Sequence, residues 1–185
     1  MNALPLVLTA LLLSPQAPPP FQASTSPVSD ALRTSMASAS KNLVGSAELM
    51  PADKYGFHPT PAQMTFGQLV VHIAQTNFAL CSAISGRPAP VTLDDMRKMS
   101  ANDPKDALVA SIKRSFDYCA DSVAKVDDSR LAEQVTMFGR GSGQSRGAAI
   151  VALAADWADH YSTAAAYLRL NDILPPTAQP KKQRP

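Results

Sequence analysis

The chain has 185 residues, enough for one domain with a sizeable core and short tails. Hydrophobic residues make up 45% and charged residues 17% of it, as in globular domains, and only eight glycines among many alanines favour helices over an all-β fold. The formal net charge is only +2 and much of it lies in residues 181–184, so we expect no nucleic-acid partner.

The amino-terminal segment has the pattern of an export signal. Residues 4–13 are nearly all apolar but too few to span a bilayer, and a Pro- and Ala-rich polar stretch follows them. We therefore expect residues 1–23 to be a signal peptide and the protein to be secreted or periplasmic, with no stable membrane span after processing. The alternative is a retained anchor helix.

The first half of the remaining chain predicts two helices. Residues 26–49 place apolar side chains on one stripe, and a Ser-Pro pair begins them, which suits a cap and a first helical position. A proline-rich linker, residues 51–61, cannot continue a helix. The second helix, residues 65–86, opens with the capping box Thr65–Gln68 and ends at a glycine.

The second half predicts two further helices and long connections. Residues 86–102 are too many for a tight antiparallel turn, which indicates a crossover between parallel helices. Residues 103–127 form the third predicted helix and residues 128–146 a loop. The fourth helix is predicted for residues 147–170, and residues 177–185 form a disordered, Pro-rich basic tail. The expected fold class is all-α.

A candidate metal site involves the second and fourth predicted helices. Asp156 and His160 are four residues apart, so they share one face of the fourth helix. A carboxylate on that largely apolar face must be paired, hydrogen-bonded or metal-bound. If His72 faces them, two imidazoles and one carboxylate form a facial triad with open positions. The alternative is a simple Asp–His pair, with His72 hydrogen-bonded to it or to Thr76.

The two cysteines, Cys81 and Cys119, leave two interpretations open. An even number of cysteines in an exported protein permits one disulfide. Two buried thiols that act as small hydrophobic side chains are the other interpretation. The residue pattern alone does not decide between them.

Several motifs of the chain together resemble the DinB superfamily of metalloenzyme-like proteins. They are the linker Met50–Pro61, the helix Phe66-Gly-Gln-Leu-Val-Val-His72-Ile-Ala, Phe116-Asp-Tyr-Cys119, Phe138-Gly-Arg140, Ala155-Asp156-Trp-Ala-Asp-His160-Tyr161, Tyr167-Leu-Arg-Leu170 and Pro175-Pro176. No single motif decides the resemblance, but their order and spacing across residues 26–176 are specific in combination.

The resemblance implies an up-down-down-up four-helix bundle in residues 26–176, with a long connection between the second and third helices. Members often bind a divalent metal through one His of the second helix and two of the fourth. Those positions correspond here to His72, Asp156 and His160, with Asp156 where the family usually has His. The carboxylate either keeps the site with an altered metal preference or abolishes it.

The same topology places Cys81 and Cys119 at similar heights on parallel helices, so the resemblance makes a disulfide compatible with the fold. Some family members transfer low-molecular-weight thiols, but those cofactors are usually cytosolic, so the predicted export disfavours that activity. A role in DNA damage is suggested only by the family name, and the export signal and weak charge disfavour it.

Two functions remain, and the residues leave open whether the chain is an enzyme. The first is a divalent-metal-dependent hydrolase or transferase that uses Zn, Ni, Mn or Fe at His72, Asp156 and His160, with a substrate cleft beside His72. The second is a non-catalytic exported bundle that binds a ligand or partner, or forms a homodimer, and whose metal site is degenerate. In the second case Asp156 and His160 satisfy each other.

Overall fold

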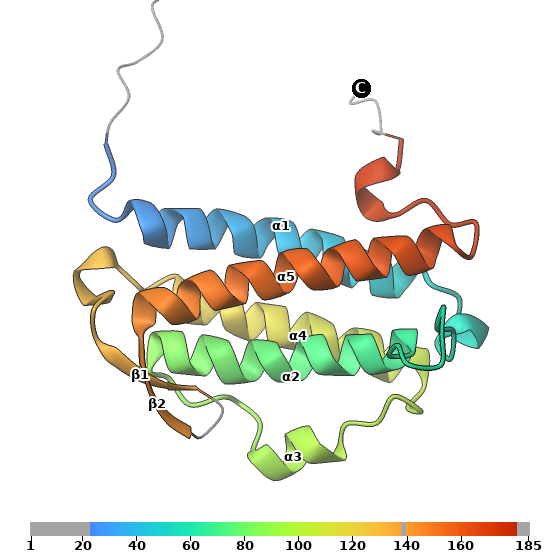
Figure 1. The fold of residues 1–185 in the computed structure, drawn as a ribbon, viewed down its shortest axis with the longest axis horizontal. Coiled ribbons are helices and arrows are strands. Elements are labelled where there is room, and N and C mark those ends of the chain that lie inside the picture. The colour runs from blue at the N-terminus through green and yellow to red at the C-terminus, as the bar shows by residue number, and fades with distance from the viewer. Residues whose placement is uncertain (1–22, 138–139, 181–185) are drawn as a thin grey trace, which may run out of the picture.

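The computed structural model describes residues 23–137 and 140–180 and is mainly helical (Figure 1). Four long helices carry the fold: α1 (Pro27–Leu49), α2 (Phe66–Ser85), α4 (Lys105–Val123) and α5 (Arg146–Arg169). A short helix, α3 (Leu93–Lys98), interrupts the connection between α2 and α4. The strands β1 (Gln134–Met137) and β2 (Arg140–Ser145) form a small antiparallel sheet before α5.

The ends of the chain limit what the structure says of the predicted signal and tail. Residues 1–22 and 181–185 lie outside the described residues. The first part of the predicted tail contains the 3₁₀ turn η3 (Pro176–Ala178), where the Thr177 main-chain N–H donates to the Tyr161 hydroxyl at 3.1 Å. None of the described helices combines the length and apolar character needed to span a membrane.

Helix α1 begins where the sequence predicts, but a distant residue caps it. The Ser26 side chain makes no capping bond to the helix. Asp128 instead accepts from the main-chain N–H groups of Val28 and Ser29, each at 2.9 Å, and from the Ser29 hydroxyl at 2.7 Å. The first helix therefore depends on a carboxylate about a hundred residues away in the chain to satisfy its amino end.

Helix α2 follows its predicted pattern closely. The Gln68 main-chain N–H donates to Thr65 Oγ1 at 3.1 Å, and the Thr65 N–H donates to Gln68 Oε1 at 2.7 Å, which completes the capping box. Gly86 ends the helix in the left-handed region with a φ of 74°. Both predicted boundaries are confirmed.

Three helix boundaries in the second half differ from the prediction. Helix α4 begins at Lys105, with Pro104 at the cap position, and not at residue 103. Helix α4 ends at Val123, several residues before the predicted end near residue 127, and Arg33 of α1 donates to the carbonyls of Val123 and Val126 at 3.2 and 2.9 Å. The predicted loop of residues 128–146 contains the β1–β2 hairpin, with Val135 buried. Ser145 caps α5 by accepting from the Ala148 N–H at 3.1 Å, so that helix starts one residue earlier than predicted.

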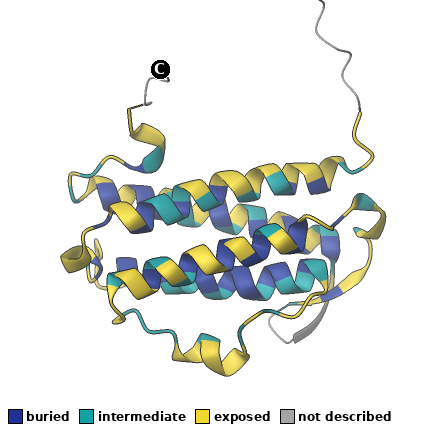
Figure 2. Ribbon diagram, turned by 180° about the vertical axis from the view of Figure 1, so that it is seen from behind, coloured by how far each residue is buried: buried dark blue, intermediate teal, exposed yellow. Residues whose placement is uncertain are grey.

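The four long helices share one core, and the buried residues in Figure 2 gather on their inward faces. Helix α2 packs on α4 and α5, and α1 packs on the same two helices from the other side. Asn77 bonds to Ser115, and Cys81 is joined to Cys119 by a disulfide with Cα atoms 5.3 Å apart. From the first pair to the second, the residue number rises by four on both helices, so α2 and α4 run in the same direction. Of the two interpretations of Cys81 and Cys119, the structure supports the disulfide.

Candidate metal centre

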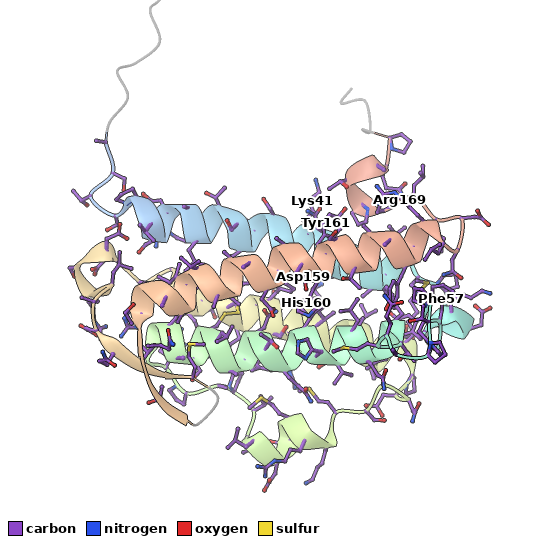
Figure 3. The ribbon with its side chains drawn as sticks, in the orientation of Figure 1. Lys41, Phe57, Asp159, His160, Tyr161 and Arg169 are labelled. Atoms are coloured by element: carbon purple, nitrogen blue, oxygen red, sulfur yellow. A yellow bond between two sulfur atoms is a disulfide. The ribbon has the colours of Figure 1, made fainter. Side chains whose placement is uncertain are left out.

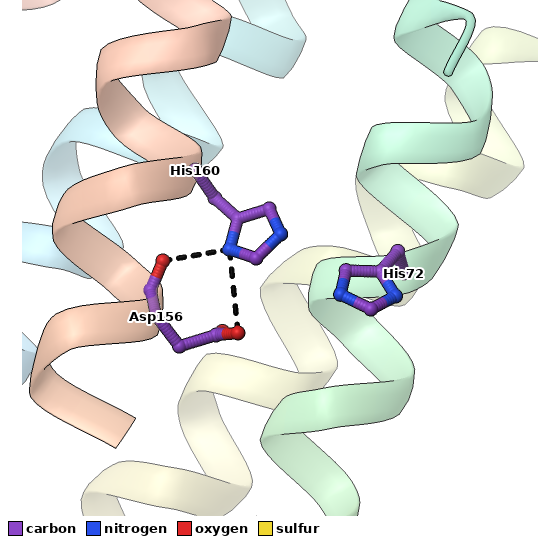
Figure 4. A group of neighbouring side chains, drawn as sticks. All are labelled: His72, Asp156 and His160. Atoms are coloured by element: carbon purple, nitrogen blue, oxygen red, sulfur yellow. Dashed lines mark hydrogen bonds and ion pairs between the residues drawn. The ribbon is translucent and has the colours of Figure 1, made fainter. Parts of the chain in front are cut away.

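The three predicted ligands converge between α2 and α5 (Figure 4). His72 of α2 faces Asp156 and His160 of α5, and one ligand atom from each side chain lies within 4.8 Å of the others. The two imidazole rings are 4.8 Å apart between centroids and tilted by 39°. Figure 3 places His160 in the middle part of the bundle, well away from the helix ends. Helical spacing predicted that Asp156 and His160 share a face, and the structure brings His72, whose position the spacing left open, next to them.

His160 is held in an orientation suited to metal binding. Its Nδ1 lies 2.6 Å from the Asp156 main-chain carbonyl oxygen and 3.4 Å from Asp156 Oδ1. A carbonyl oxygen only accepts hydrogen bonds, so Nδ1 carries the proton, and in the neutral ring Nε2 keeps its lone pair. An outer hydrogen bond of this kind fixes the tautomer and orientation of metal-ligating histidines.

Asp156 supplies the observation that tests whether a metal fits. Its side chain is 21% exposed, and its Oδ2 atom is buried without a hydrogen-bond partner anywhere in residues 23–137 and 140–180. A buried carboxylate oxygen without a partner is costly. A divalent cation held by Asp156 and the two imidazoles would remove that cost. The donor set of two nitrogens and one oxygen suits a first-row divalent metal.

The surroundings shift the pKa values of the two histidines in opposite directions. Burial, followed by the neighbouring His160, lowers the pKa of His72, although Asp156 opposes the shift. The hydrogen bond to the Asp156 carboxylate raises the pKa of His160, although burial acts against it. His72 is therefore neutral at physiological pH and presents a free lone pair, while His160 binds its proton more tightly.

A cleft of about 1280 Å³ begins at His72 and runs along α2. Its opposite wall is the connection that contains α3, and β1 and Arg146 line its far part. The Gln75 side chain donates to the Met96 carbonyl at 2.7 Å, which ties that wall to α2 one turn from His72. His72 is the one member of the triad that lines the cleft, so the triad and the cleft meet there.

Comparison with known proteins gives the family. The model of the DinB superfamily matches residues 36–164, more than half of the chain, and this span contains His72, Asp156 and His160. The chain belongs to the DinB superfamily. A search of curated proteins finds no match. The superfamily resemblance inferred from the sequence motifs is confirmed.

A buried cluster of three hydrogen-bonded side chains in this DinB domain positions the site, and the sequence patterns did not predict it. The Trp157 indole N–H donates to Asn77 Oδ1 at 2.7 Å, and Asn77 Nδ2 donates to Ser115 Oγ at 2.9 Å. All three residues are buried and they link α2, α4 and α5. Trp157 directly follows Asp156, so these bonds fix the rotation of α5 at the candidate ligands Asp156 and His160. The sequence signal was present as an asparagine on an otherwise apolar stripe.

Proposed function

We propose that this DinB-superfamily protein is a divalent-metal-dependent hydrolase or transferase. Its metal, one of Zn, Ni, Mn or Fe, is held by His72, Asp156 and His160, and its substrate binds in the cleft along α2. The observation that carries this proposal is that His72 belongs both to the triad and to the lining of the cleft. A ligand in the cleft therefore reaches the open coordination positions that a three-residue set leaves.

Different residues of the chain would hold the metal, orient its ligands and shape the cleft. When bound, a metal at this site supplies Lewis-acid polarisation of a substrate atom or a lowered pKa for a bound water or thiol. The Asp156 carbonyl holds the His160 ring so that Nε2 points away from its own helix turn. Gln75 keeps the cleft wall against α2, and apolar side chains such as Phe78 and Met96 in that lining exclude water from the bound part of the substrate.

Export to the periplasm or the exterior is the second part of the proposal. The apolar run of residues 4–13 supports it, as does the disulfide between Cys81 and Cys119. Disulfides persist in oxidising compartments and are rare in the cytosol. The two observations come from different parts of the chain, so they support export independently.

The up-down-down-up order of the four long helices belongs to the same proposal. Asn77–Ser115 and Cys81–Cys119 support parallel α2 and α4. Arg33 near the start of α1 bonds to carbonyls at the end of α4, which supports an antiparallel α1 and α4. The α2–α5 pair has His72 opposite His160 and Asn77 opposite Trp157, which supports opposite directions there.

A second candidate is a non-catalytic bundle whose metal site is degenerate. The observation that favours it is the contact between His160 Nδ1 and the Asp156 carboxylate, which partly satisfies both side chains without a metal. It leaves Asp156 Oδ2 without a partner in the described residues, and it does not explain why the cleft begins at a member of the triad. We therefore rank it below the metal-dependent enzyme.

The test is the metal content of the mature protein, purified without an affinity tag and measured by elemental analysis, with melts in the presence and absence of chelator. We expect about one equivalent of a divalent metal, as a single mononuclear site requires, and a lower Tm in chelator. Asp156→Asn should lose most of the metal, and the matched control Asp159→Asn, whose residue is exposed on the same helix, should keep it. No metal and no chelator effect in the wild type would leave the non-catalytic bundle.

A further inference from the structure

A second, smaller cavity lies where α2 and α4 end and α5 begins, at the end of the bundle opposite the linker that follows α1 (Figure 1). Its volume is about 140 Å³. The lining is basic and hydroxylic and consists of Ser85, Arg87, Ser122, Lys125, Val126, Arg130 and Arg146. None of these residues belongs to the metal triad.

Two of the lining residues carry buried polar atoms that have no partner. Ser122 is fully buried, and its Oγ atom makes no hydrogen bond within the described part of the chain. The Arg146 side chain is only 5% exposed, and its Nε–H likewise lacks an acceptor there. Both atoms can donate, so the cavity offers two unused donors and calls for an acceptor.

The charges around the cavity are unbalanced. Glu133 accepts from Arg130 at 2.8 Å and from Arg146 at 2.9 Å, and these hydrogen bonds, Arg130 first, lower the pKa of the Glu133 carboxyl to about 2. Asp127 acts on Arg130 through space. Lys125 makes no ion pair with any described residue. The four cations of the lining thus outnumber the two carboxylates that act on them, and Arg146 carries one of these positive charges into the buried part of the cavity.

Structural roles account for part of this cluster. The Arg87 guanidinium donates to the Asp121 carbonyl at 3.0 Å, as expected for a cation near the carboxyl end of a helix. Such roles do not employ Ser122 Oγ or Arg146 Nε. A single water occupies about 30 Å³ of liquid, so one water would not fill the cavity.

We propose that this cavity binds a tetrahedral oxyanion, a phosphate or sulfate group, through the Ser122 hydroxyl, Arg146 Nε and the surrounding cations. Such a group accepts several charge-assisted hydrogen bonds at once, which matches the unused donors. Arg87 and Arg146 also line the large cleft, so the oxyanion is either a free ion or the end group of a longer ligand that lies along α2. The site stands apart from the metal triad and does not rest on the proposed activity.

The experiment titrates inorganic phosphate into the protein in the presence of EDTA, so that binding to a metal does not contribute. Tm and calorimetric binding are compared with sodium chloride at matched ionic strength, which removes general screening. We expect phosphate to raise Tm beyond chloride, and the same rise in His72→Ala. An alkyl phosphate distinguishes a free ion from the end group of a longer ligand. If it binds more tightly than inorganic phosphate, the cavity takes an end group; if the two bind equally, the cavity takes a free ion.

Variants connect the effect to the cavity. Lys125→Ala should weaken phosphate binding about tenfold, the usual size for one charged hydrogen bond, while Lys113→Ala on the exposed face of α4 should not. Ser122→Ala removes one buried donor with little change in volume and should also weaken binding. The proposal is overturned if phosphate and chloride act alike on the wild type, or if Lys113→Ala loses binding as much as Lys125→Ala does.

Discussion

Removing the disulfide should destabilise the domain by an amount that the chain geometry sets. The double variant Cys81→Ala/Cys119→Ala releases a crosslink between residues 38 apart in sequence. For a closed loop of that length the chain-entropy model gives about 4 kcal/mol at 25 °C. A domain of this size loses about 2–4 °C in Tm per kcal/mol, so we expect Tm to fall by roughly 8–16 °C.

Burial of the two cysteines makes the loss of about 4 kcal/mol a lower estimate. Both cysteines are fully buried in the core, so each Cys→Ala change also leaves a small void. Burial further means that a reductant reaches the sulfurs only through unfolded molecules. The assay is therefore a circular-dichroism melt of the wild type and the double variant, before and after unfolding and refolding in reductant.

Reductant should lower the Tm of the wild type towards that of the double variant and leave the variant itself unchanged. The reasoning is refuted if the two proteins melt within about 3 °C of each other without reductant, since that difference corresponds to only about 1 kcal/mol instead of about 4. It is equally refuted if wild-type protein made in an oxidising compartment and denatured without reductant shows two free thiols per chain.

Three further changes probe other parts of the fold. Hydrogen bonds from Arg130 and Arg146 hold the pKa of Glu133 near 2, below its usual 4.5, so their stabilisation is complete above about pH 4.5 and is lost as the pH falls towards 2. The Tm advantage of wild type over Glu133→Gln should shrink across that window, and a constant difference would contradict it. Gly67→Ala brings a Cβ to 2.8 Å from a main-chain carbonyl of the α2–α4 connection, so denaturant melts should show a loss of stability despite alanine's gain of about 1 kcal/mol in helix propensity. Trp157→Phe leaves the buried Asn77 Oδ1 without its donor and should lower the free energy of unfolding by about 1–3 kcal/mol in the same melts. An unchanged denaturation midpoint would show that the Trp157–Asn77 hydrogen bond does not stabilise the fold.

Local sequence signals were sufficient to predict that the four long helices exist and where α2 begins and ends. The capping box of Thr65 and Gln68 and the glycine after α2 act within a few residues of each other, so the boundaries followed from the pattern. The proximity of the three candidate ligands followed partly from a local signal and partly from the family resemblance. Asp156 and His160 share a face because of helical spacing alone, and the family resemblance brought His72 to them.

The features that were missed depend on contacts between distant segments. Helix α4 ends at Val123, where Arg33 of α1 donates to the carbonyls of Val123 and Val126. Arg33 lies far away in the sequence, so no local pattern at the helix end includes it. The β1–β2 hairpin lies in a stretch rich in Gly and Ser, where strand pairing rather than propensity decides. The cleft and the small cavity form between segments that meet only in three dimensions. Helix α3 is the exception, since its capping box of Thr92 and Asp95 was visible in the sequence.

The capping of α1 by Asp128 has a consequence for the order in which the chain folds. Helix α1 packs chiefly on α4 and α5, and its amino end is completed by a residue about a hundred positions later. Contacts of such high sequence separation form late and slow the folding of a domain. During synthesis the amino-terminal third therefore lacks its partners until nearly the whole domain has been made. For the proposed export, this order of contacts would leave the leading end of the chain without its tertiary partners while the rest of the domain is still being made.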